Sequence, residues 1–167
     1  MLKIRRGFFK EFLTVPDIES IFYSFLKVHT SFMIFTTLPS IFISTFLMAQ
    51  SGSMNVVLYF NAIYYFGTAA GMFVAIPVLR KFGSGLISLI GILLYCLLYL
   101  LLIVFNVSSS SYVVLLGCIY GMGGAFYWLS YSYRVTEYST LENRDSALAV
   151  ISMFASAVNL FAPLISG

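Results

Sequence analysis

The chain has 167 residues, of which 60% are hydrophobic and only 9% are charged, and its formal net charge is +3. A soluble domain carries about 25% charged residues, so this composition excludes a protein surrounded by water and predicts an integral membrane protein. The cations lie beside long apolar stretches, and the positive charge therefore indicates contact with a membrane rather than with nucleic acid.

The first 27 residues are predicted to form a cytoplasmic segment. They are basic but lack the short apolar core and cleavage site of a signal peptide, so the first long apolar run is expected to stay in the protein as a helix. Ile18, Ile21, Phe22 and Phe25 recur at helical spacing. They predict an amphipathic helix that begins near Pro16, lies at the membrane interface and runs into the first span.

Residues 28–167 are predicted to form a transmembrane region of five helices. A span needs about 20 mostly apolar residues, and five segments meet this requirement: 28–50, 56–79, 86–105, 112–133 and 147–165. The runs are too long and too continuously apolar for the alternating strands of a barrel. The predicted fold class is therefore all-α, a polytopic transmembrane helical bundle whose first partner is the lipid bilayer.

All nine Lys and Arg residues fall on one side of this five-helix arrangement. Cytoplasmic loops of membrane proteins carry an excess of Lys and Arg. We therefore expect a multi-pass protein of the plasma membrane with a cytoplasmic N-terminus.

Small residues recur four positions apart in two of the spans, as Gly67 and Gly71 in the second and Gly117 and Gly121 in the fourth. This spacing forms a groove that lets a neighbouring helix approach closely. Two interpretations stay open, which are ordinary close packing and a surface along which helices slide when they rearrange.

Several polar and aromatic side chains lie at membrane depth, among them the amides Asn61 and Asn159 and the rings of Tyr127 and Trp128. An amide at this depth is expected to face protein or a wet cavity rather than lipid, and aromatic residues near an interface can be simple anchors. Each of these residues therefore has two interpretations, a structural contact or a lining position in a cavity. Pro39, in the middle of the first span, predicts a kink.

The sequence shows little that points to chemistry. No span contains Asp, Glu, Lys or Arg in its interior, and His29 near the cytoplasmic end of the first span is more typical of an interfacial residue than of a proton relay. No nucleophile–base pair, metal-ligand cluster or phosphate-binding loop is visible. We therefore expect neither an enzyme nor a cofactor or metal site.

Charged residues gather in two cytoplasmic connections. Arg80 and Lys81 lie between the second and third spans, and Glu137, Arg144 and Asp145 lie between the fourth and fifth. Solvated loops explain both clusters, but opposite charges can also join them, although an exposed ion pair contributes only about 0–1 kcal/mol. We expect Arg80 or Lys81 to pair with an acidic residue of the other connection: Glu137, Glu142 or Asp145.

Three stretches resemble the N-terminal half of a major facilitator superfamily transporter. A basic turn with Gly83 joins the second and third spans, where the family has G-x-x-x-D-R-x-G-R-R. Glu137 precedes Arg144 by seven residues and Ala147 follows, which is similar to the family's turn before helix five. APLISG at 162–167 is similar to the end of that helix, and GGAFYWLSY before ENRD resembles permeases of Gram-positive bacteria.

This resemblance covers about residues 28–167 and implies five of the family's twelve helices. It implies alternating access, in which the first, second, fourth and fifth spans face a central cavity for a small-molecule substrate. The implied lining residues are Thr36, Asn61, Tyr65, Tyr127, Trp128 and Asn159. The implied gating charges are Arg80, Lys81, Glu137, Arg144 and Asp145.

The sequence also departs from the family pattern in its basic turn. Arg80 takes the acidic position, Ile76 replaces the leading glycine, and Ser84 and Gly85 replace the following cations. With five spans, a closed cavity would need a missing C-terminal half or partner helices. The alternative is a small, non-transporting membrane interaction protein that binds a partner helix through its glycine faces, or a decayed, truncated permease.

Overall fold

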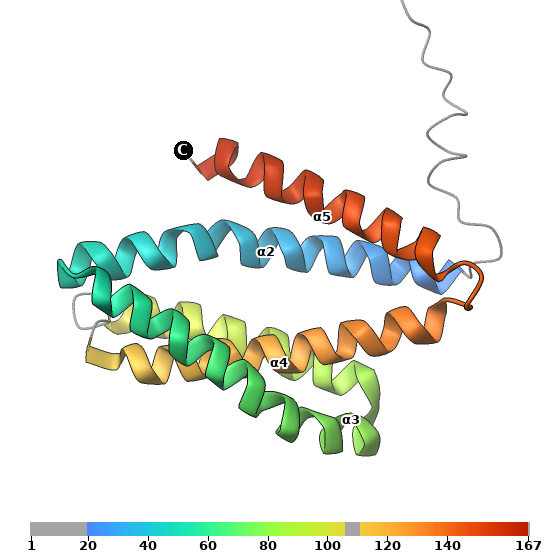
Figure 1. Ribbon diagram of the computed structural model, residues 1–167, viewed down its shortest axis with the longest axis horizontal. Helices are drawn as coiled ribbons and strands as arrows, with labels where there is room; N and C mark the ends of the chain where they lie inside the picture. The colour runs from blue at the N-terminus through green and yellow to red at the C-terminus, as the bar shows by residue number, and fades with distance from the viewer. Residues whose placement is uncertain (1–19, 106–110, 167) are drawn as a thin grey trace, which may run out of the picture. The chain divides into compact units, whose positions relative to one another are not determined.

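The computed structural model describes residues 20–105 and 111–166, and these form four helices joined by short connections. The helices are α2 (Ser20–Ser51), α3 (Met54–Phe105), α4 (Val113–Tyr138) and α5 (Arg144–Ser166) (Figure 1). This confirms the predicted all-α fold class. The expected helix start near Pro16 and the side chains of the APLISG stretch lie outside the described residues.

Three of these helices are long and apolar enough to cross a membrane: the part of α2 from Ile21 onward, α3 and α4. The 23 residues of α5 also exceed the length of about 20 that a span requires. The helices therefore agree with a multi-pass membrane protein. The expected spans at 56–79 and 86–105 both fall within α3, and the spans at 112–133 and 147–165 fall on α4 and α5.

Helix α2 is one continuous helix of 32 residues that passes through Pro39 without a break. Residues 20–27, which were expected as part of an interfacial helix, belong to the same helix as the first span. Proline removes one backbone donor from a helix, and the Ser40 hydroxyl nearby donates a hydrogen bond to the Thr37 carbonyl at 2.8 Å. The predicted kink stays a prediction.

Helix α3 has 52 residues and would be about 78 Å long if it were straight. It instead turns back on itself, as Figure 1 shows, because its backbone leaves the helical conformation at Gly83 with φ 80° and ψ 172°. We call residues 54–82 the first limb and residues 84–105 the second limb. A loop was expected at 80–85, but the reversal is confined to one residue, Gly83. Glycine is the residue type that adopts this backbone conformation without strain.

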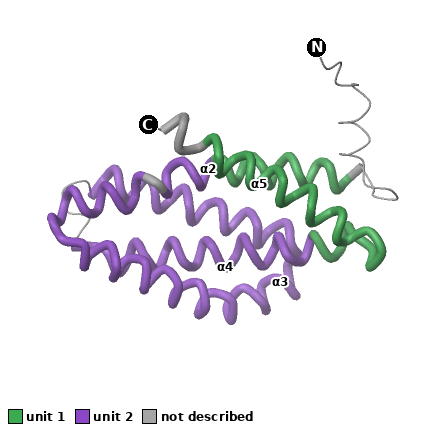
Figure 2. Tube along the Cα trace, turned by 45° about the horizontal axis from the view of Figure 1, so that its top comes forward, with its two compact units in different colours: residues 1–34, 135–167 green, residues 35–134 purple. Residues whose placement is uncertain are grey.

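The chain divides into two compact units, which Figure 2 distinguishes by colour. Unit 2 holds residues 35–134, with the second half of α2, all of α3 and α4 as far as Arg134. Its core is a cluster to which α2, both limbs of α3 and α4 all contribute: Ile43, Leu47, Val57, Phe60, Leu98, Leu102 and Leu116. Both limbs of α3 therefore pack with α4 in one helical unit.

Unit 1 holds the first half of α2, the end of α4 and helix α5. Phe25 packs against His29 and Tyr138, with ring centroids 6.0 and 5.9 Å apart. The connection to α5 is ordered by Asn143, whose side-chain oxygen accepts a hydrogen bond from the Thr140 amide at 2.8 Å and whose carbonyl accepts one from Ala147. Asn143 therefore occupies the N-cap position of α5, and its side chain orders the residues before the helix.

Candidate functional site

The predicted glycine faces bring the first limb of α3 against α4 within unit 2. A Cβ added to Gly121 would lie 2.5 Å from the Tyr64 carbonyl oxygen and 2.7 Å from the Thr68 nitrogen. One added to Gly67 would lie 3.4 Å from the Cα of Cys118. At Gly71 the nearest atom would be the Cβ of Ala125 at 2.7 Å, and at Gly117 a side-chain carbon of Ile63 at 2.9 Å. The two backbones therefore touch along several helical turns.

Asn61 and Tyr65 lie on the first limb of α3. Asn61 is half-buried, and its Nδ2 donates a hydrogen bond at 2.9 Å to the Val57 carbonyl of its own helix. Tyr65 is 69% exposed, with its ring centroid 4.9 Å from that of Tyr64. The tyrosine therefore offers its ring and hydroxyl at the surface of unit 2.

Tyr127 and Trp128 are neighbours in sequence but occupy different environments. Tyr127 is buried against the second limb of α3, where a Cβ added to Gly91 would lie 2.8 Å from the Tyr127 nitrogen. Trp128 is 36% exposed and packs edge-on against Tyr131, with ring centroids 5.3 Å apart. Tyr127 thus packs two helices together, whereas Trp128 is partly exposed.

The two other candidate lining residues lie in different units. Thr36 is buried in unit 2, and Asn159 is exposed on α5 in unit 1. The exposed candidates are therefore Tyr65, Trp128 and Asn159.

Sequence reasoning missed a cluster of tyrosines inside unit 2. Tyr120 of α4 lies between Tyr64 of the first limb and Tyr95 of the second, with ring centroids 4.5 and 5.2 Å away. Tyr95 in turn neighbours Tyr99 at 6.5 Å, whose buried hydroxyl has no hydrogen-bond partner among the described residues. All of these tyrosines lie near the middle of predicted spans. That position was an available signal, because aromatic anchors belong at the two interfaces.

Unit 2 also has an open apolar groove between α2 and the second limb of α3, with a volume of about 700 Å³. Leu38, Pro39 and Phe42 line one wall, and Tyr99, Leu102 and Ile103 line the other. The groove lacks a charged side chain among these lining residues. Lipid tails or apolar protein surface suit such a groove.

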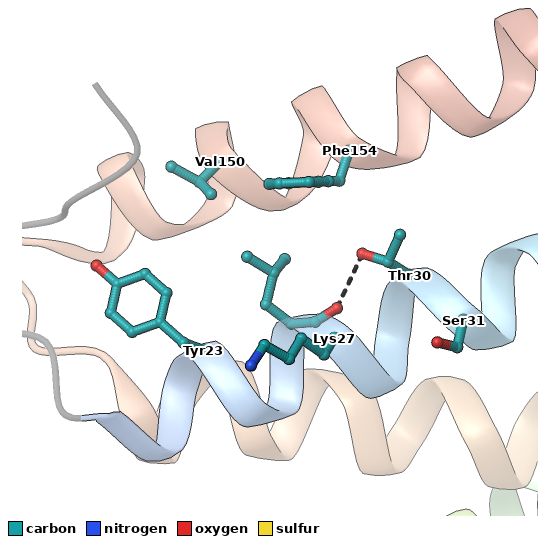
Figure 3. Close-up of a pocket in the computed structure, with 7 residues that line it drawn as sticks. Tyr23, Lys27, Thr30, Ser31, Val150 and Phe154 are labelled. Carbon is teal, nitrogen blue, oxygen red and sulfur yellow. Dashed lines mark hydrogen bonds between the residues drawn. The ribbon is translucent and has the colours of Figure 1, made fainter. Parts of the chain in front are cut away.

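A smaller pocket of about 470 Å³ lies in unit 1 between the first half of α2 and α5 (Figure 3). Leu26 from α2 and Val150 and Phe154 from α5 form its apolar wall. Lys27 brings the one charged group among its lining residues. The sequence had placed this lysine before the first span rather than in the wall of a pocket.

The reversal of α3 is fastened to α4 by polar contacts that the sequence did not reveal. The buried Ser130 hydroxyl donates a hydrogen bond at 2.8 Å to the Ser84 carbonyl, immediately after Gly83. Arg134 Nε makes a longer contact with the Ser84 hydroxyl at 3.4 Å. A Cβ added to Gly85 would lie 3.8 Å from the Arg134 guanidinium. The small residues Ser84 and Gly85 therefore leave room for Arg134 where the family pattern has cations.

The candidate gating charges occupy helix ends rather than loops. Arg80 and Lys81 are exposed at the end of the first limb, and the Lys81 ammonium lies 5.2 Å from the ring centroid of Phe82. Arg144 and Asp145 lie in the first turn of α5, where an acidic residue is favoured by the helix dipole. Arg144 Nε donates a hydrogen bond to the Ser139 hydroxyl at 3.2 Å.

Glu137 is an exposed residue in the last turn of α4. The expected pairing of Arg80 or Lys81 with Glu137, Glu142 or Asp145 stays a prediction.

Two curated bacterial proteins are similar to this chain. Uncharacterized protein YqgE of Bacillus subtilis (strain 168) is 22% identical over 130 residues, which cover 78% of this chain and 30% of that protein. An uncharacterized protein in the sodM 3′ region of Geobacillus stearothermophilus is 20% identical over 131 residues, which cover 78% of this chain and 61% of that protein. The chain therefore spans less than two thirds of the length of either relative. No solved structure is a significant match.

A family model described as Major Facilitator Superfamily matches residues 22–167. The match begins at Phe22, two residues after the start of α2, and includes α3, α4 and α5. It agrees with the long apolar helices of the structure. The chain belongs to the major facilitator superfamily of membrane transporters.

Proposed function

We propose that the protein provides the N-terminal helices of a permease that moves a small solute across the plasma membrane by alternating access. The family match over residues 22–167 carries the proposal. In this superfamily, inverted three-helix repeats form each half of the transporter, and the substrate site lies near the bilayer midplane. The helices that close the cavity come from a C-terminal half or from partner helices, and the N-terminus is cytoplasmic.

The exposed candidate residues support a substrate that is neutral or amphipathic. Tyr65 and Trp128 offer aromatic faces and a hydroxyl, and Asn61 lies one turn before Tyr65 on the same limb. Ligand sites are mostly apolar and carry a few polar groups that fix orientation. We therefore assign Tyr65 and Trp128 to direct contact with the substrate and Tyr127 to packing behind Trp128.

The test uses the full-length protein in sealed vesicles with labelled neutral, amphipathic and strongly charged solutes, both with and without a pH gradient. We expect a neutral or amphipathic solute to accumulate above the level in empty vesicles. Tyr65→Ala should lower its initial rate, whereas Tyr59→Ala should not. Tyr59 is a suitable control because it is 66% exposed on the same limb but outside the candidate lining.

Two outcomes contradict the proposal. One is equal loss of transport in the Tyr65 and Tyr59 variants, which would remove the assigned contact. The other is a combination of two results. No solute shows flux, and an impermeant thiol reagent reaches the cysteine of a Trp128→Cys variant from the same one side of the membrane in all conditions, which would mean that access does not alternate.

The non-transporting alternative gains no support from the structure. It required the glycine faces to bind a partner helix, but Gly67, Gly71, Gly117 and Gly121 contact each other's helices within unit 2. A partner helix would have to displace this internal packing. We therefore do not propose a second function.

A further inference from the structure

The unit 1 pocket combines an apolar wall with a single positive charge. Its apolar side is formed by Leu26 of α2 and by Val150 and Phe154 of α5, and Figure 3 shows the side chains of Val150 and Phe154 on the side of α5 that faces α2. The exposed Lys27 lines the same pocket, and no acidic side chain does so among its lining residues. A ligand that matches both parts has an apolar body and an anionic group, which is the chemistry of an anionic amphiphile.

The polar groups of the pocket lie on the α2 side. Thr30 donates its hydroxyl to the Leu26 carbonyl at 2.8 Å, as the dashed line in Figure 3 shows. Tyr23 and Ser31 also line the pocket, one helical turn before and after Lys27. Tyr23, Thr30 and Ser31 therefore bring three hydroxyls to the same lining as Lys27, and hydroxyls suit the oxygen atoms of a headgroup.

The position of Lys27 along α2 selects the kind of amphiphile. The candidate membrane span of α2 begins at Ile21, so Lys27 lies within its first two turns. A lysine near the end of a span extends its ammonium toward the headgroup layer while its methylenes stay in apolar surroundings. The predicted cytoplasmic N-terminus places this level in the inner leaflet, which is rich in anionic lipid, and basic pockets between helices on that side bind such headgroups.

We propose that the pocket between α2 and α5 binds an anionic phospholipid. The lipid phosphate pairs with the Lys27 ammonium, and an acyl chain lies against Val150 and Phe154. The lipid thereby joins the first and last described helices of unit 1. This site is independent of the proposed transport function, because it requires neither a substrate nor a C-terminal half.

The test is native mass spectrometry of the detergent-purified full-length protein, with dioleoyl phosphatidylglycerol or dioleoyl phosphatidylcholine added at equal concentration. We expect preferential retention of phosphatidylglycerol. Lys27→Gln should weaken that retention about fivefold, the factor for losing one lysine near anionic lipid, and Lys27→Glu should weaken it further. Retention of phosphatidylcholine should stay unchanged in both variants.

Two further variants separate the pocket from general charge. Lys81→Glu reverses an exposed cation of unit 2 and should leave the retention of phosphatidylglycerol as it is. Ser31→Trp fills the pocket from an exposed position and should lower retention of both lipids. Size-exclusion elution of each variant shows that it is folded.

Three lipid-retention results overturn the proposal. They are equal retention of the two lipids by the unaltered protein, the same loss in the Lys27 and Lys81 variants, and unchanged retention in Ser31→Trp. If a labelled transport solute protects Lys27 from amine modification while phosphatidylglycerol does not, the pocket belongs to the substrate, and the lipid assignment is wrong.

Discussion

At the scale of single residues, glycine determines how closely α3 and α4 approach. Burying apolar surface gives little net driving force between helices in lipid, because the acyl chains are as apolar as the side chains. Close van der Waals contact and interhelical hydrogen bonds therefore carry more of the association. Gly121 is the tightest of the described contacts, since its neighbours are backbone atoms of the opposite limb that cannot rotate away.

Gly121→Ala should destabilise the protein, because its methyl group would lie 2.5 Å from the Tyr64 carbonyl oxygen and would force the helices apart. We expect a loss of about 1–3 kcal/mol, as for other overpacked positions. This loss is measured by heating the protein in detergent and recording the fraction that stays monodisperse at each temperature.

Gly124→Ala is the matched control in the same helix. Its methyl group would meet the Tyr95 hydroxyl at 3.5 Å, an ordinary contact, and alanine favours helix over glycine by about 1 kcal/mol. We expect this control to be neutral or slightly stabilising. Equal denaturation temperatures for the two variants would show that the α3–α4 approach is looser than described.

At the scale of elements, the reversal of α3 depends on one backbone conformation. Gly83→Ala should cost about 1–3 kcal/mol, because φ 80° with ψ 172° is nearly restricted to glycine. Gly85→Ala adds the same methyl group two residues later, where it would lie 3.8 Å from the Arg134 guanidinium, and should be tolerated. Denaturation temperature and the yield of folded protein in membranes distinguish the two. A Gly83 variant as stable as the Gly85 variant would contradict the assigned conformation.

The contact between Ser130 and Ser84 should stabilise the same reversal. Ser130→Ala leaves the Ser84 carbonyl without this donor, and we expect a loss of about 1 kcal/mol, within the range of hydrogen bonds between membrane helices. Ser156→Ala removes a hydroxyl from an exposed position of α5 and serves as the control. The denaturation temperature of each variant is measured in the same way. An unchanged denaturation temperature in Ser130→Ala would show that this hydrogen bond does not stabilise the reversal.

Hydropathy was sufficient to predict the helices, but side-chain contacts determined details that it does not encode. The length of the apolar runs predicted spans at 56–79 and 86–105, and these correspond to the two limbs of α3. The predicted loop at 80–85 did not form, because Gly83 alone reverses the chain and Ser130 holds the following residue. Likewise α4 extends to Tyr138, five residues beyond the predicted end of the span, and the short connection to α5 is held by the hydrogen bond from the Thr140 amide to the Asn143 side chain.

The candidate site was less predictable than the helices. Sequence distance does not show which face of a helix is covered, so Tyr127 and Trp128 received the same interpretation although one is buried and the other is exposed. Lys27 was assigned to the segment before the first span by its charge. Its place in a pocket depends on contacts with α5, which begins more than a hundred residues later.

At the scale of the whole molecule, the distribution of charge makes a prediction about topology. The connection between α2 and α3 contains no Lys or Arg, whereas Arg80 and Lys81 lie beside the reversal of α3, and Arg134 and Arg144 flank the α4–α5 connection. The positive-inside rule places the charged connections in the cytoplasm. Asn55, at the start of α3, should therefore face outward, and Thr140, between α4 and α5, should face inward. Both residues are exposed and can be replaced individually by cysteine.

The measurement uses a background in which the half-buried Cys96 and Cys118 are replaced by alanine. In intact cells, a membrane-impermeant maleimide should label Asn55→Cys but not Thr140→Cys, and Thr140→Cys should react only after the membrane is permeabilised. Labelling of Thr140→Cys in intact cells would invert the orientation. It would also move Lys27 away from the cytoplasmic leaflet, whose negative surface potential supports the lipid assignment, so this one experiment constrains both the topology and the unit 1 pocket.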